Sequence, residues 1–307
     1  MSAVSSFSLG ATLYMSATRS DILDVVLQEK VKGLRSLVIC LEDSVADANV
    51  TFALSNLAKV TDHLAKAPTK ASRPLIFIRP RNIAMAKQLV ASLNLSAIDG
   101  MVLPKFTLAS LALWEDTLEK TPLLWMPTLE TQEVFDSVQM VSLANALAAS
   151  VAHSKIIALR IGGNDLMSLI GLRRSRTSTL YEGPLGYLVK MLVCIFAAKG
   201  FSLTSPVCEM IDNQELLAKE IEQDVLHGLV GKTAIHPNQI AIIQKAWLVD
   251  QAEYEDAVRI LNSNLAVFKH AGAMCEPATH RKWAERILEQ CHHCGINRVN
   301  NSVEQAY

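Results

Sequence analysis

Residues 156–166, with the sequence IIALRIGGNDL, decide the fold of this chain. An apolar run ends in two glycines, Asp165 follows, and a helix-forming segment begins at Leu166. This order predicts a buried strand whose carboxyl end turns sharply and presents Asp165. Taken alone, Asp165 is better explained as the N-cap of the next helix. Only the recurrence of the pattern elsewhere in the chain points to a functional role.

The same pattern recurs along most of the sequence. Eight apolar segments of strand length alternate with eight helical segments through short connections. This alternation favours a parallel (β/α)₈ TIM barrel, an α/β fold, over a Rossmann sheet. The first strand also lacks the GxGxxG fingerprint of dinucleotide-binding sheets. The predicted strands cover residues 9–15, 37–41, 74–78, 100–103, 123–127, 156–161, 201–207 and 229–235.

The barrel does not need the whole chain. We predict a TIM-barrel catalytic domain at residues 1–250 and a C-terminal helical extension at residues 251–307. Within the extension, the pattern predicts helices at 253–268 and 278–294 with a loop between them at 270–277. Because an open barrel mouth admits water, we expect the extension to act as a lid.

Composition narrows the classes of function. The chain has 307 residues, of which 50% are hydrophobic, and this suffices for the large core of one barrel. The net charge is −1 and no run of Lys or Arg occurs, so neither nucleic acid nor a membrane surface is an expected partner. No basic leader precedes an apolar run, and no apolar stretch reaches about 18 residues. We therefore expect a cytoplasmic protein acting on a small molecule.

Charged residues stand at the predicted carboxyl end of nearly every strand. Such charges are costly beside hydrophobic strands unless they are paired or bind a ligand. Ion pairing explains any one of them, whereas a polar pocket on one face of the barrel explains the set. They are Arg19, Glu42, Asp43, Arg79, Lys105, Glu130, Asp165, Glu209 and His236.

Glu130 and Asp165 follow the adjacent fifth and sixth strands. Two carboxylates with no cation between them repel each other, and a divalent cation removes this conflict. Mg²⁺ commonly binds one or two carboxylates together with waters and substrate oxygens. Arg79, after the third strand, is suited to a two-pronged contact with a substrate carboxylate. The set predicts a magnesium site that holds a 2-oxo acid and stabilises the enolate formed when a carbon–carbon bond is made or broken.

Short motifs at these strand ends resemble a known family. They lie within a region from about Thr12 to Arg259 that resembles the citrate lyase β-subunit-like (CitE-like) branch of the HpcH/HpaI aldolases. In that family, Arg79 falls at the substrate-carboxylate arginine, and Glu130 and Asp165 fall on the two Mg²⁺ ligands. The motifs are ATR at 17–19, LEDSV at 41–45, LPK at 103–105, LET at 129–131, NDL at 164–166 and GKTAIHP at 231–237.

The resemblance implies a Mg²⁺-dependent carbon–carbon lyase or aldolase. Members of the family usually act on a CoA thioester such as citryl-CoA or malyl-CoA. The resemblance implies that Glu130 and Asp165 are the metal ligands. It implies that Glu42 and Asp43 are catalytic residues that position metal-bound water, and that Arg79 is a catalytic residue that holds a carboxylate. Arg19 and Lys105 are the implied substrate-binding residues, which neutralise charge.

The lid motif departs from the family pattern. The family often carries a GxMxDxP-like motif whose Asp acts across a subunit boundary, whereas residues 272–277, GAMCEP, are one residue shorter and place Glu276 there. We expect Glu276 to serve as an acid or base, over either its own barrel or the barrel of a neighbour. The resemblance favours the neighbour and a homo-oligomer, most simply a trimer. Such departures resemble a divergent CitE-like group associated with tellurite-resistance gene clusters.

Two other functions use the same residues. A metal-dependent acyl-CoA thioesterase would need the same metal and enolate chemistry. A non-catalytic barrel, serving as a subunit or binding protein, would keep the pocket without metal-dependent turnover.

Overall fold

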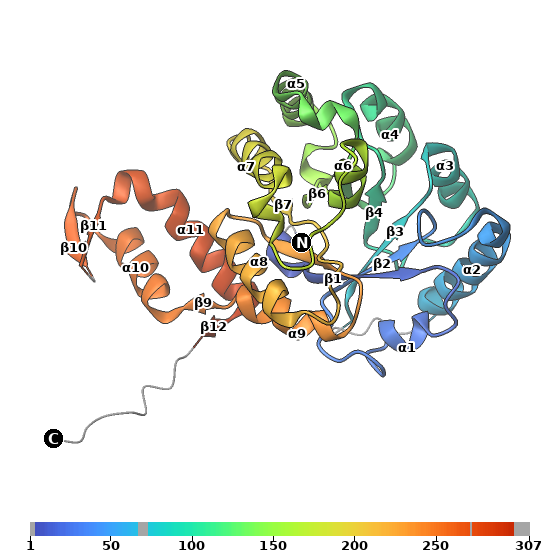
Figure 1. Ribbon diagram of the computed structural model, residues 1–307, viewed down its shortest axis with the longest axis horizontal. Helices are drawn as coiled ribbons and strands as arrows, with labels where there is room; N and C mark the ends of the chain where they lie inside the picture. Colours follow the sequence, from blue (N-terminus) through green and yellow to red (C-terminus); the bar gives the residue numbers. More distant parts are fainter. Residues whose placement is uncertain (1–3, 67–72, 271, 298–307) are drawn as a thin grey trace.

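A computed structural model, which describes residues 4–66, 73–270 and 272–297, contains the predicted barrel (Figure 1). Eight strands pair in parallel in the order β7-β6-β5-β4-β3-β2-β1-β8. A bridge between Ser205, directly after β7, and Lys232 of β8 connects the two strands at the ends of this order and closes the barrel. The strands are β1 (Gly10–Ser16), β2 (Ser36–Cys40), β3 (Leu75–Arg79), β4 (Gly100–Leu103), β5 (Leu124–Leu129), β6 (Leu159–Ile161), β7 (Leu203–Thr204) and β8 (Gly231–Ala234).

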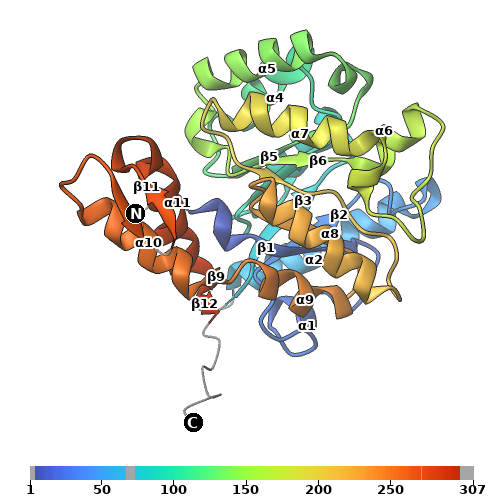
Figure 2. The ribbon, with the colours of Figure 1, turned by 60° about the vertical axis from the view of Figure 1, so that its left-hand side comes forward.

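The helices surround the strands, as Figures 1 and 2 show. This layering buries both faces of each strand, which explains why every residue of β2 is buried and why all but Ser36 are apolar. None of the helices within the described ranges is long and apolar enough to cross a bilayer. The surrounding helices are α1 (Ile22–Val26), α2 (Val50–Lys66), α3 (Ile83–Ser92), α4 (Leu111–Leu118), α5 (Ser137–Ala149), α6 (Gly163–Leu169), α7 (Pro184–Ala197), α8 (Gln214–Leu226) and α9 (Asn238–Ala246).

The decisive stretch forms a shorter strand than predicted. Ile156 makes only an isolated bridge to Trp125, and regular pairing begins at Leu159. The preceding residues form a 3₁₀ turn, η5 (His153–Lys155), and Ile156 is its C-cap rather than a residue of the regular strand. The position of the carboxyl end, where the function was expected, is unchanged.

The C-terminal extension differs from its prediction in two places. The helix predicted at 253–268 ends at Asn262 as α10 (Gln251–Asn262), and a hairpin begins at Phe268 and extends into the predicted loop at 270–277. The hairpin consists of β10 (Phe268–His270) and β11 (Ala273–Cys275), and Phe268 and Cys275 bury their side chains against α10 and α11 (Pro277–Cys294). Sequence periodicity missed this hairpin because each strand has only three residues. A further parallel pair, β9 (Val249–Asp250) with β12 (Ile296–Asn297), joins the residues before α10 to those after α11.

Helix α11 packs against the amino-terminal end of the barrel. Gln290 donates to the Trp247 carbonyl at 3.0 Å, and Ser5, before β1, donates to Glu289 at 2.6 Å. Arg286 donates to the carbonyl of Gly228, which precedes β8. The extension therefore lies beside the end of the barrel opposite to the carboxyl ends of the strands (Figure 2).

A buried ionic network joins β8 to α8. The Lys232 ammonium lies 2.8 Å from both Glu220 and Asp224, and all three side chains are fully buried. Arg174 completes the network through an ion pair with Glu220, and Tyr181 donates to Asp224 at 2.7 Å. Each buried charge of this network thus has an opposite charge within contact distance, as a buried ion requires.

We predict that Lys232→Met destabilises the protein by about 3–5 kcal/mol, because it leaves two buried carboxylates without their shared cation. Urea denaturation followed by circular dichroism measures the change. The matched control is Lys87→Met, which removes an exposed lysine paired with Asp116 at 2.8 Å and should leave the midpoint close to wild type. Equal midpoints for both variants would contradict a stabilising role for the network.

Candidate active site

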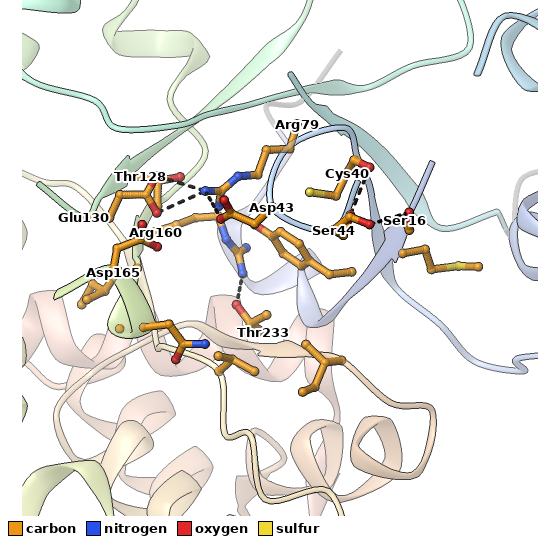
Figure 3. Close-up of a pocket in the computed structure, with 18 residues that line it drawn as sticks. Ser16, Cys40, Asp43, Ser44, Arg79, Thr128, Glu130, Arg160, Asp165 and Thr233 are labelled. Atoms are coloured by element: carbon orange, nitrogen blue, oxygen red, sulfur yellow. Dashed lines mark hydrogen bonds and ion pairs between the residues drawn. The ribbon is translucent and has the colours of Figure 1, made fainter. Parts of the chain in front are cut away.

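A pocket of about 390 Å³ opens at the carboxyl ends of the barrel strands (Figure 3). Residues from seven of the eight strand ends line it, and the volume suits a small organic acid. Among the residues predicted for the site, Asp43, Arg79, Glu130 and Asp165 line this pocket.

Arg79, the last residue of β3, forms the centre of the charged cluster. Its guanidinium pairs with Glu42 and lies 3.1 Å from Glu130. Asp43 is more distant, at 3.8 Å, and its side chain is largely exposed. Arg79 itself is only 7% exposed, so its charge is shared among carboxylates that are mostly shielded from water.

Glu130 is buried at the end of β5 and accepts hydrogen bonds from two directions. Besides Arg79, the backbone N–H of Lys105 donates to it at 2.7 Å. Lys105 has a left-handed backbone with a φ of 48°, uncommon for a residue other than glycine, and this turn directs its N–H inward. Burial raises the pKa of Glu130 to about 7, although Arg79 and the Lys105 amide act in the opposite direction. Near neutral pH this carboxyl can therefore hold a proton or exchange it for a cation.

Asp165 lies in the first turn of α6 rather than at its N-cap, which is Gly162. Burial, followed by the nearby Asp43 carboxylate, raises the pKa of Asp165. Its nearest cation is the Lys105 ammonium at 3.9 Å, which also lies 2.9 Å from Glu42. The N-cap alternative for Asp165 is therefore wrong, and the side chain faces the pocket as a weakly compensated carboxylate (Figure 3).

Gly162 is required by the approach of Glu130. A Cβ atom at position 162 would lie 2.4 Å from both Cβ and Oε2 of Glu130, closer than real contacts allow. The backbone of Gly162 has an ordinary negative φ, so its role is to leave space rather than to permit an unusual turn. Gly162 thus allows the ends of β5 and β6 to lie close together beside Glu130.

The donor set fits a divalent cation that needs few protein ligands. No group of three or more His, Cys, Asp or Glu side chains arranged for a metal occurs in the described part of the chain. Glu130 and Asp165 share one pocket, and both have raised pKa values that a bound cation would relieve. Mg²⁺ commonly binds through one or two carboxylates and keeps several waters. These two residues could hold it, whereas a closed zinc site would need more ligands.

Arg19 and Glu276 do not line this pocket. Arg19 forms a two-pronged pair with Asp21, at 2.7 and 2.8 Å, and its side chain is largely exposed. Glu276 stands at the start of α11, where its carboxylate accepts a hydrogen bond from Thr279 at 3.1 Å. Because α11 packs on the opposite end of the barrel, Glu276 does not cover the pocket of its own chain.

Several polar side chains that line the interior of the pocket were not predicted from the sequence. The pocket lining includes Arg160, Thr128 and Thr233, which Figure 3 labels, and also Tyr14. The available signal was Arg160, a charged residue inside the otherwise apolar run of β6. Only the strand register, which pairs Arg160 with Thr128, shows that it shares a layer of the barrel with other polar side chains.

Comparisons with known proteins agree with this fold. The model of a protein family described as C–C bond lyase of the TIM-barrel fold matches residues 3–296. The chain is 26% identical over 265 residues to a (3S)-malyl-CoA thioesterase of Cereibacter sphaeroides strain KD131. That match covers 85% of this chain and 83% of the relative.

Two solved structures share the architecture. CitE from Mycobacterium tuberculosis, in complex with magnesium, acetoacetate and coenzyme A, has a TM-score of 0.66 and 22% identity, with 92% of this chain and 98% of that chain covered. A citrate lyase from Burkholderia xenovorans LB400 has a TM-score of 0.72 and 16% identity, with 95% and 94% covered. At these identities the likeness is one of fold.

We predict that Gly162→Ala destabilises the protein by about 1–3 kcal/mol, because the added methyl group collides with the Glu130 carboxylate. Thermal unfolding measures this cost. Gly183→Ala is the control, since its added Cβ would have, its chain neighbours aside, only the Leu180 carbonyl oxygen of the described residues near it, at 3.8 Å. A Gly162→Ala protein as stable as the control would contradict the close approach between β5 and β6.

Proposed function

The chain belongs to the C–C bond lyase family of the TIM-barrel fold, and we propose that it is a Mg²⁺-dependent lyase or aldolase for a 2-oxo acid or a citryl-CoA-like or malyl-CoA-like thioester. The observation that carries this proposal is that Glu130 and Asp165 line the same pocket beside Arg79. Cleavage of such a substrate leaves an enolate, and these residues supply what an enolate needs. They provide a site for a divalent cation and a nearby fixed positive charge.

Each charged residue has a role in this proposal. Glu130 and Asp165 hold Mg²⁺, which when bound would polarise a substrate carbonyl. Arg79 keeps Glu130 in position and neutralises a substrate carboxylate, and Lys105 places a second positive charge between Glu42 and Asp165. The exposed Asp43 and the buried Glu42 orient water around the metal, and Arg19 neutralises charge on a part of the substrate that stays outside.

The pocket volume favours the acid part of a thioester as its occupant. A volume of about 390 Å³ is at the lower end for small-molecule sites, so a CoA moiety would lie along the surface while the acyl group enters. The CitE structure from Mycobacterium tuberculosis, which contains both acetoacetate and coenzyme A, supports this division.

A thioesterase is the second candidate, and the name of the Cereibacter relative favours it. The two activities are separated by their products from malyl-CoA with Mg²⁺ present. Cleavage of the carbon–carbon bond yields acetyl-CoA and glyoxylate, whereas hydrolysis of the thioester consumes water and yields malate and free CoA. Chromatography of the CoA species therefore decides between them.

We further propose that the C-terminal extension completes the pocket of a neighbour in a homotrimer. A pocket that protects an enolate needs a cover against water, and the extension of each chain lies at the wrong end of its own barrel to supply one. Glu276 would then act as an acid or base for the adjacent subunit.

The metal proposal predicts that Mg²⁺ binds the wild type and not the Glu130→Ala, Asp165→Ala double variant. Because the pKa of Glu130 is about 7, a proton competes with the metal below that pH. The affinity should therefore fall by up to about tenfold for each pH unit below 7. Isothermal titration calorimetry measures both effects. Asp116→Ala, which changes an outer-surface carboxylate, is the control and should bind as the wild type does. Equal binding by the double variant would remove the proposed site.

The lid proposal predicts complementation between two inactive variants. Mixing Glu276→Gln with Asp165→Ala chains under subunit exchange gives sites that combine an intact Asp165 with an intact Glu276 from a neighbour. In a randomly mixed equimolar trimer about a quarter of the sites are complete, so about a quarter of the activity should return. Native mass spectrometry confirms the exchange and the oligomeric state. Exchange without recovery would show that the chains do not share sites.

A further inference from the structure

Four cationic side chains are buried in the described part of the protein, and one of them lacks an acidic partner. Arg79 pairs with Glu42 and Glu130. Arg174 and Lys232 belong to the ionic network at α8. Arg160 is 2% exposed, yet no carboxylate of the described residues lies within 4 Å of its guanidinium. The fold thus pairs three buried positive charges with its own acids, whereas the fourth forms no ion pair and is only weakly attracted by Glu130.

The partners of Arg160 are all neutral. Its Nη2 donates to the Thr233 hydroxyl, and its Nη1 lies 3.7 Å from the sulfur of Met126. The guanidinium carbon stands 5.1 Å from the ring centroid of Tyr14, a cation–π arrangement. These contacts hold the side chain in place without cancelling its charge.

An uncompensated buried charge is expensive for a protein to maintain. Arginine cannot avoid the cost by losing its proton, because its pKa remains above any physiological pH even where burial lowers it, as it does here. The positive charge of Arg79 in the same pocket adds repulsion. A residue kept in such a state is suited to receive an anion from outside the chain.

Arg160 is accessible to such an anion because it lines the pocket (Figure 3). In the strand register it stands opposite Thr128, two residues before Glu130. Two residues of a strand span about 7 Å. Arg160 therefore belongs to a layer of side chains that lies about 7 Å below the carboxylates at the mouth of the pocket. A ligand held at Glu130 and Asp165 would therefore extend toward Arg160.

We propose that Arg160 binds a second carboxylate of the substrate at the floor of the pocket, so that the acid accepted by this protein is a dicarboxylate. This inference rests on the proposed function and adds the chemical class of the acid. The planar guanidinium can engage a carboxylate through two parallel hydrogen bonds, a geometry that lysine cannot reproduce. The carbonyl or hydroxyl end of the acid remains at the mouth, where Arg79 and the metal ligands lie, and the distal carboxylate reaches Arg160. Because this distal carboxylate must be free, the inference favours a free dicarboxylate or a citryl-CoA-like thioester over malyl-CoA, in which the distal carboxyl carries the CoA.

The test uses acids that differ only in the distal group. The two pairs are 2-oxoglutarate with 2-oxopentanoate, and malate with 2-hydroxybutyrate. Calorimetry on the full-length protein with Mg²⁺ should show at least one dicarboxylate binding about tenfold or more tightly than its partner, equivalent to about 1.4 kcal/mol. In Arg160→Met the ratio of the two dissociation constants should fall to about one. Thr12→Val, a buried threonine outside the pocket lining, is the control and should keep the wild-type ratio.

A second variant covers the case in which Arg160→Met does not fold. Thr233→Val removes the hydroxyl that orients the guanidinium and keeps a similar volume, so it should reduce the ratio while the protein remains folded. A wild type that does not distinguish the acids overturns the inference, as does a ratio that persists in either variant. If the monocarboxylates bind with Mg²⁺ but no preference appears, only the inference fails. If no acid binds in a Mg²⁺-dependent manner, the proposed function fails with it.

Discussion

The ion cluster around Arg79 is the interaction on which the mouth of the barrel depends. Glu42 and Glu130 approach the same guanidinium from different strands, and both are almost completely buried. Neither carboxylate would be stable there without a positive charge close by. Burial outweighs the attraction of Arg79 and raises the pKa of Glu130. The cluster is therefore organised to take up additional positive charge, which is the property that a metal site requires.

Backbone geometry brings these charges together. Parallel strands end at one face, so residues far apart in the sequence meet without long loops. Two local features refine the arrangement. The left-handed turn at Lys105 directs an N–H toward Glu130, and the missing side chain at Gly162 leaves room for the Glu130 carboxylate. Both features lie in the connections that follow strands, where a change of backbone does not disturb the ladder.

The two ends of the barrel have different functions. The carboxyl end holds incompletely compensated charges, and the amino end is joined to helix α11 by hydrogen bonds to backbone carbonyls. Away from the pocket, Lys232 forms ion pairs with both Glu220 and Asp224. The buried Lys232 thus has acidic partners, whereas Arg160, which lines the pocket, forms no ion pair with the described residues. This contrast distinguishes Arg160 from Lys232, although both are buried cations on barrel strands.

The sequence by itself determined the barrel, because alternating apolar and amphipathic segments leave few other ways to bury eight strands. It also determined that Glu130 and Asp165 would meet, since adjacent parallel strands end side by side. The extension was harder to predict: a hairpin of three-residue strands leaves no periodic signal, and nothing in the sequence of α11 says which end of the barrel it covers. Only the tertiary structure decided that Arg19 pairs with Asp21 outside the pocket and that Arg160 lies within it beside neutral groups. The physical reason is that the charge balance of a side chain depends on the distances to its neighbours in space, and neighbours from distant strands are not encoded in any local pattern.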